Sequence, residues 1–124
     1  MPLHIDIPTH EQVSRLFETI GPRCVSIYLP TGPTSPGQAE RIALKNFVAE
    51  AVDQLTEAGA DKREITALEE QFSDLLADEY FWRYLARSLA VFATPEWLVT
   101  YRLPNRLTEI VDVADRFHLG PLLR

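Results

Sequence analysis

The spacing of hydrophobic residues predicts an alternation of helices and strands along one chain. Thr9 followed by Gln12 has the form of a capping box, and apolar residues at helical spacing come after it until Gly21-Pro22. The apolar residues of this first helix are Val13, Leu16, Phe17 and Ile20. Residues 24–29 are rich in β-branched and aromatic side chains on both faces, which predicts a central strand.

A second helix is expected after the loop 30–37, with Ser35 as its N-cap. Its buried stripe is predicted to contain Leu44, Phe47, Val48, Ala51, Val52 and Leu55. Gly59 ends this helix, and Asp61 with Glu64 opens a third. The inner face of the third helix is predicted to contain Ile65, Leu68, Phe72, Leu75 and Leu76, and the aromatic run Tyr80-Phe81-Trp82 follows.

From residue 88 the hydrophobic period changes to two. Strands are expected at 89–93, 97–103 and 107–113, the first two joined by a turn at 94–96. The order α-β-α-α-β-β-β predicts an α+β fold. We expect a single two-layer domain over residues 1–124, with a mainly antiparallel or mixed four-stranded sheet packed by helices on one or both faces.

The net charge of −6 disfavours a protein that binds nucleic acid over its whole surface, and DNA binding is not expected. The charge is uneven, because residues 61–79 carry two basic and seven acidic groups whereas residues 80–124 carry six and four. Cys24 is the only cysteine, and the chain shows neither a signal peptide nor an apolar stretch long enough for a membrane. These features predict a cytoplasmic protein without a membrane partner.

Two adjoining segments hold the candidate binding residues. Arg41 and Lys45 lie four apart on the second helix with Asn46 beside them, which predicts a small cationic patch opposite the buried stripe. The alternative is a solvated face on which Glu40 and Glu50 partly cancel the charge. In the preceding loop, the prolines and the lack of Gly-Lys-Ser/Thr exclude a P-loop. The loop is either a recognition loop or a connector, and its polar candidates are Thr31, Thr34 and Ser35.

Two further clusters have weaker chemical meaning. His4, Asp6 and His10 match no known metal-ligand spacing, so we expect no metal and no cofactor. Residues 115–118 combine Asp115, Arg116, Phe117 and His118, which permits an acid–base pair for a small hydrolase. The preferred interpretation is structural, with Phe117 in the core and Asp115 and His118 bonding to the chain as it leaves the last strand. We therefore expect a protein that is not an enzyme.

Several segments, in their order and spacing, resemble the N-terminal domain of bacterial relatives of the archaeo-eukaryotic class 1 peptide-chain release factors. They are VSIYLP (25–30), RIALKN (41–46), SLAVF (88–92), YRLP (101–104), DVADRFHL (112–119) and PLL (121–123). The resemblance implies a translation-associated domain. The Asn-Ile-Lys-Ser motif that reads stop codons in the family is absent here, and the five glycines are never adjacent, so the Gly-Gly-Gln release motif is absent too.

The resemblance leaves two functions open. The first is a domain that binds the ribosome, RNA or a ribosome-associated protein, using Arg41, Lys45, Asn46 and the loop residues. The second is a protein-interaction or oligomerisation module, based on the acidic 61–79 face, the aromatic run 80–82 and the apolar C-terminal tail. The family's chains continue beyond this point, so we expect a domain that lacks the family's downstream domains. Its tail would then expose surface that favours self-association.

Overall fold

The fold is α+β, as the sequence predicts. The computed structural model describes residues 3–5, 9–31, 38–78, 81–82, 88–103 and 106–123. Its elements are β1 (Leu3–Ile5), α1 (His10–Glu18), β2 (Ile20–Pro30), α2 (Gln38–Glu57), α3 (Lys62–Ala77), β3 (Ser88–Ala93), β4 (Leu98–Leu103), β5 (Ile110–Arg116) and a 3₁₀ turn at Pro121–Leu123. The predicted order α-β-α-α-β-β-β is confirmed from α1 to β5.

The strands form one sheet in the order β1-β4-β3-β2-β5. β2 lies between β3 and β5 and is antiparallel to both, which confirms the central strand predicted from its two apolar faces. β3 and β4 form the expected hairpin. The sequence did not predict β1, which runs parallel to β4 and pairs with Val99–Tyr101. Three residues are too few to show a strand period.

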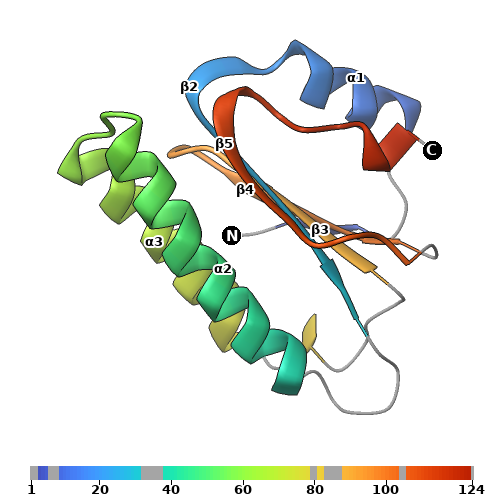
Figure 1. The fold of residues 1–124 in the computed structure, drawn as a ribbon. Coiled ribbons are helices and arrows are strands. Elements are labelled where there is room, and N and C mark those ends of the chain that lie inside the picture. Colours follow the sequence, from blue (N-terminus) through green and yellow to red (C-terminus); the bar gives the residue numbers. More distant parts are fainter. Residues whose placement is uncertain are drawn as a thin grey trace.

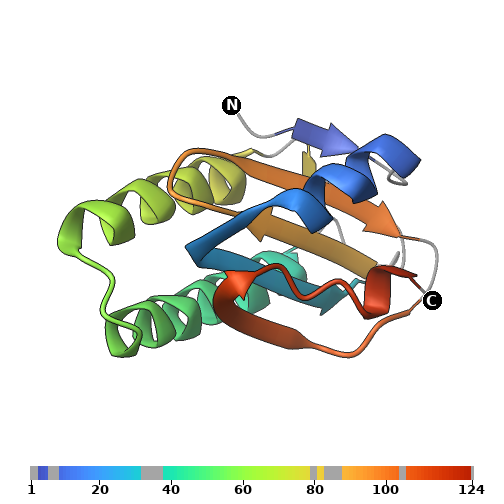
Figure 2. The ribbon, with the colours of Figure 1, turned by 90° about the horizontal axis from the view of Figure 1, so that it is seen from above.

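Both faces of the sheet are covered. Figure 1 shows α2 and α3 as a hairpin across one face, with α1 and the C-terminal segment on the other, and Figure 2 shows the same layers from above. Because successive strand residues point to opposite faces, the core is divided in two. The residues of β2 show this division: Val25, Ile27 and Leu29 pack toward α2 and α3, whereas Cys24 and Tyr28 pack toward α1.

Capping residues fix the ends of two helices as predicted. The Thr9 side chain accepts a hydrogen bond from the N–H of Gln12, whose side chain accepts one from the N–H of Thr9. Asp61 and Glu64 form the same reciprocal box at the start of α3. Gly59 has a φ of 87° between α2 and α3, a conformation that favours glycine.

Some expectations about positions were wrong. Ile20, which was expected on the first helix, belongs to β2, because α1 ends at Glu18. The side chains of Phe17 and Ile20 are 52% and 63% exposed. β5 begins and ends three residues later than the predicted 107–113 strand. The expected N-cap Ser35 lies outside the described residues.

Candidate functional site

Three strand ends meet at one end of the sheet. β2 ends at Pro30, which pairs with Ser88 at the start of β3, and Ser88 in turn pairs with Leu103 at the end of β4. Figure 1 shows the beginning of α2 at this same end of the molecule. We call this region, defined by the first two turns of α2, residues 81–82 and the strand ends at Pro30 and Leu103, the α2 end.

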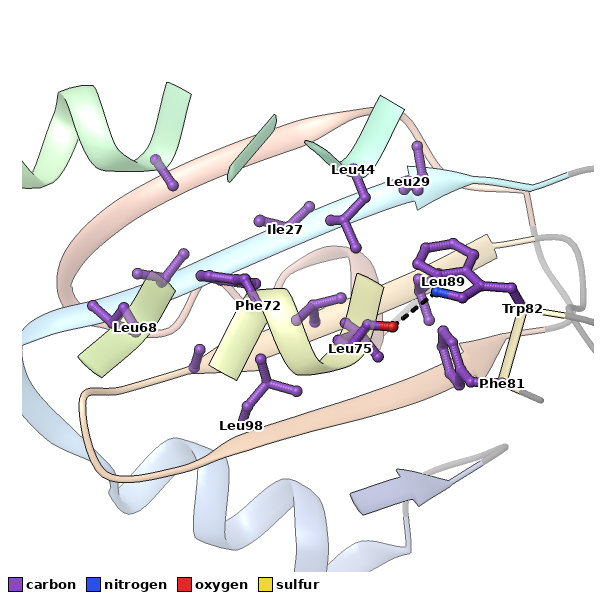
Figure 3. Close-up of a cluster of buried hydrophobic side chains, with 14 of the residues drawn as sticks. Ile27, Leu29, Leu44, Leu68, Phe72, Leu75, Phe81, Trp82, Leu89 and Leu98 are labelled. Atoms are coloured by element: carbon purple, nitrogen blue, oxygen red, sulfur yellow. Dashed lines mark hydrogen bonds between the residues drawn. The ribbon is translucent and has the colours of Figure 1, made fainter. Parts of the chain in front are cut away.

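A buried aromatic pair lies at the centre of the α2 end. The rings of Phe81 and Trp82 meet edge to face, with centroids 5.2 Å apart and planes at 85°. The indole Nε1 of Trp82 donates to the backbone oxygen of Leu75 at 2.9 Å (Figure 3), and the N–H of Phe81 donates to the Asp78 carboxylate at 3.1 Å. Both rings therefore belong to the core, so two of the three aromatic residues of the predicted interaction surface are not exposed, and Tyr80 lies outside the described residues.

Two arginines from distant parts of the sequence stack on this pair. The guanidinium carbon of Arg41, in the first turns of α2, lies 5.8 Å from the centroid of the Trp82 ring. That of Arg102, in β4, lies 5.1 Å from the centroid of the Phe81 ring. Cation–π contacts of this kind orient a guanidinium without neutralising its charge. The structure thus adds Arg102 to the candidate site, and its only sequence signal was a charge inside an otherwise apolar strand.

The predicted patch on α2 is only partly realised. Arg41 is half-buried against Trp82 rather than opposite the buried stripe, and its Nε is buried without a hydrogen-bond partner among the described residues. Lys45 and Asn46 are exposed one turn further along the helix. Glu40 is 7% exposed, so it does not lie on a solvated face as the alternative interpretation required.

The loop candidates divide between the described and the undescribed residues. Thr31 follows β2 directly and is buried, which leaves little of its side chain for a ligand. Thr34 and Ser35 lie outside the described residues.

A pocket on the α1 face of the sheet has a further basic residue in its lining. It has a volume of about 610 Å³ and is lined by Arg106, Leu107, Thr108, Ile110, His118, Gly120 and Pro121. Ile110 pairs with Tyr28, and both Leu107 and Ile110 pack against the hydrophobic cluster that faces α1. The side chains of Arg106 and His118 are exposed there. No sequence pattern indicated Arg106, because its place depends on the path of the chain from β4 to β5.

Residues 115–118 have different roles from one another. Asp115 and Arg116 are exposed at the end of β5, whereas Phe117 is buried against Phe92 and Trp97, with ring centroids 5.3 and 5.5 Å apart. The N–H of His118 donates to the Ser26 hydroxyl at 2.9 Å.

The carbonyl oxygen of His118 accepts a hydrogen bond from the hydroxyl of Tyr28. The polar side chains that hold this segment therefore come from β2, and His118 contributes its backbone. Asp115 instead lies beside Cys24, where burial and the Asp115 charge both raise the pKa of the thiol. Asp115 and His118 thus have separate neighbours, and the structure shows no hydrogen bond between these two described side chains.

Within the described ranges, no three His, Cys, Asp or Glu side chains gather in a way that could hold a metal ion. The side chains of His4 and Asp6 lie outside the description. None of the helices that the structure describes is long and apolar enough to cross a bilayer.

Comparison with solved structures identifies proteins of similar fold. An archaeal protein superposes with a TM-score of 0.64 at 16% sequence identity, covering 96% of this chain and 36% of the other. The archaeal translation termination factor aRF1 superposes with a TM-score of 0.62 at 16% identity, covering 90% of this chain and 32% of the other. The chain has a release-factor-like fold.

The extent of this likeness limits what it shows. The chain spans about a third of the length of these two solved proteins. No protein-family model and no curated protein sequence matches it. At 16% identity the similarity shows the fold alone, so it does not assign the activity of the longer proteins to this chain.

Proposed function

We propose that this domain works in translation as a non-enzymatic RNA-binding module, with ribosomal RNA as its ligand and the α2 end as its contact surface. The observation that carries the proposal is the pair of arginines held on the Phe81–Trp82 rings, with Lys45 exposed one turn along α2. The release-factor-like fold supports a role in translation, since one similar structure is named as a translation termination factor.

The chemistry of the α2 end fits a phosphate backbone better than it fits bases. Arg41 and Lys45 present cationic groups from one helix, and Arg102 adds a third from the end of β4. The aromatic rings that would stack on bases are buried under the arginines. We therefore propose electrostatic contact with phosphates, which positions a protein without reading sequence.

Two activities of the longer release factors are not part of the proposal. The sequence has no Asn-Ile-Lys-Ser motif, which the resemblance associates with stop-codon reading, and no Gly-Gly-Gln motif, which it associates with peptide release. A translation role would place the protein in the cytoplasm.

Lys45 is the sharpest site for a test because it is exposed, so its replacement leaves the core intact. Lys45→Glu and the control Lys62→Glu replace the only two lysines, and each moves the net charge from −6 to −8. Lys62 begins α3 and is also exposed, at the opposite end of the α2–α3 hairpin (Figure 1). The two variants therefore differ in the position of the charge change and not in its size.

The measurement is co-sedimentation with purified ribosomes over a series of salt concentrations. Binding of the unmodified chain should weaken as salt rises, and Lys45→Glu should reduce the slope of log K against log salt by roughly 0.7 to 1 for one lost phosphate contact. Lys62→Glu should leave both affinity and slope unchanged. Equal effects of the two variants, or no sedimentation with ribosomes at low salt, would remove the basis of the proposal.

A further inference from the structure

A side chain of α2 occupies the outer edge of the sheet. β5 is the last strand in the sheet order, and β2 is its partner on the inner side. Gln54 of α2 donates from Nε2 to the backbone oxygen of Val111 at 3.1 Å. Its Oε1 accepts from the N–H of Val113, also at 3.1 Å. One amide thus binds two backbone groups of β5.

These two backbone groups are the ones that another strand would use. In the β2–β5 ladder, Val111 lies opposite Ile27 and Val113 opposite Val25. In an antiparallel ladder, alternate residues direct their N–H and C=O groups to the two sides of the strand. Because the bonds to Gln54 leave the sheet, Val111 and Val113 point their backbone groups outward. The Gln54 amide therefore stands where a peptide group of a neighbouring strand would be.

We propose that the outer edge of β5 is a strand-pairing surface that Gln54 closes, and that its partner when open is β5 of a second copy of this chain. An unpaired strand edge is a template for association with another chain, and natural proteins cover or block such edges. This inference is independent of RNA binding, which involves the α2 end.

The residues of β5 favour pairing with an identical strand. Between positions 110 and 114 the sequence is Ile-Val-Asp-Val-Ala, which has three β-branched aliphatic residues and a single charge. Segments of high β-propensity and low charge are the ones that pair most readily when exposed. Two copies of one edge can meet in antiparallel orientation about a twofold axis, which gives a closed dimer.

The test compares two glutamines that lie on helices of the same layer. The side chain of each donates a hydrogen bond to a backbone carbonyl oxygen outside its own helix. Gln54→Ala opens the edge of β5, and alanine keeps the helix. In the control Gln71→Ala, the lost bond is from Gln71 Nε2 to the backbone oxygen of Thr94, 2.7 Å long. Thr94 lies in the turn between β3 and β4, so this change removes a hydrogen bond without opening an outer strand.

The readouts are the average mass by sedimentation velocity and the hydrogen exchange of the Val113 amide. For Gln54→Ala we expect the average mass to rise from one chain toward two as concentration increases. The Val113 amide should exchange faster than in the unmodified chain when the variant is dilute, and regain protection when it is concentrated. Gln71→Ala should stay monomeric at every concentration, with unchanged exchange at Val113.

A second pair of variants separates edge pairing from general loss of stability. Gln54→Lys removes the same two bonds but places a charge over the edge, which blocks pairing, so it should stay monomeric. If Gln54→Ala does not fold, Gln54→Ser opens the same edge and is read in the same way. Two results overturn the proposal. One is a folded Gln54→Ala variant that loses Val113 protection yet stays monomeric. The other is a Gln71→Ala or Gln54→Lys variant that self-associates as strongly as Gln54→Ala does.

Discussion

The hydroxyl of Tyr28 joins the central strand to the C-terminal segment, and its removal should weaken the whole domain. Tyr28 is fully buried in β2, its ring meets the Phe92 ring edge to face at 5.8 Å, and its hydroxyl donates to the carbonyl oxygen of His118. Tyr28→Phe keeps the ring and removes the hydroxyl. The part-buried His118 carbonyl then loses its donor, which costs about 0.5–1.5 kcal/mol, the net contribution of a typical hydrogen bond.

Tyr101→Phe is the matched control. Tyr101 is also buried on the α1 face of the sheet and its ring also packs on Phe92, at 6.0 Å. The structure shows no hydrogen bond from its hydroxyl to a described residue, so this change should cost less than Tyr28→Phe. Urea unfolding measures both, and a loss of about 1 kcal/mol would lower the midpoint by about 0.5 M for a typical slope. Equal losses for the two variants would refute the role assigned to the Tyr28 hydroxyl.

The same tyrosine predicts a dependence on alkaline pH. Burial raises the pKa of Tyr28 well above its usual value near 10, so the unfolded chain loses its phenolic proton first as the pH rises. The unfolding free energy is then unaffected below about pH 10 and falls above it, by up to about 1.4 kcal/mol per pH unit for one tyrosine. Tyr28→Phe should therefore lose stability less steeply between about pH 10 and 11 than the unmodified chain. An equally steep fall of the unfolding free energy with pH in both proteins would contradict the raised pKa of Tyr28.

Two further predictions concern single side chains. Burial, and then the Asp115 charge, raise the pKa of the Cys24 thiol. A thiol reagent that releases a coloured product should therefore react with Cys24 no faster than the domain unfolds. Fast reaction of the folded protein would contradict the protection of this thiol. Asp61→Ala removes the capping box with Glu64 and should cost about 0.5–2 kcal/mol in thermal or urea unfolding. The exposed Asp53→Ala should change stability by less than about 0.5 kcal/mol, and equal losses would contradict the capping role.

Features that depend on neighbouring residues could be predicted from the sequence. The capping boxes at Thr9 and Asp61 involve residues three positions apart, and Gly59 acts through its own φ angle. The same local rules failed at Ile20, whose helical spacing from Leu16 hid the start of a strand. A single residue, Thr19, separates α1 from β2, and hydrophobic spacing does not locate so short a turn.

The candidate site could be predicted only in part, because its members come from three separate segments. Arg41 and Lys45 share a helix, so their spacing was informative. Arg102 joins them only because residues 81–82 pack between α2 and β4, and no local pattern encodes that packing. Likewise the bonds of Gln54 to β5 span more than fifty residues of sequence.

The acidic balance of the chain does not oppose binding at the α2 end, because salt limits the reach of exposed charges to a Debye length of about 8 Å at physiological ionic strength. Glu57, at the far end of α2, lies twelve residues from Lys45, which is about 18 Å along a helix, so its charge is largely screened there.

The nearer acidic residues on α2 are Glu40 and Glu50, each five residues from Lys45 and therefore about 140° away around the helix axis. Residues that neighbour each other on a helix surface are three or four positions apart. Around Lys45 these positions hold Arg41, Ile42, Val48 and Ala49. The one charge among these helical neighbours is the stacked Arg41, which is cationic like Lys45. A phosphate at Lys45 therefore meets a second cation on the same side of α2, although the chain as a whole is acidic.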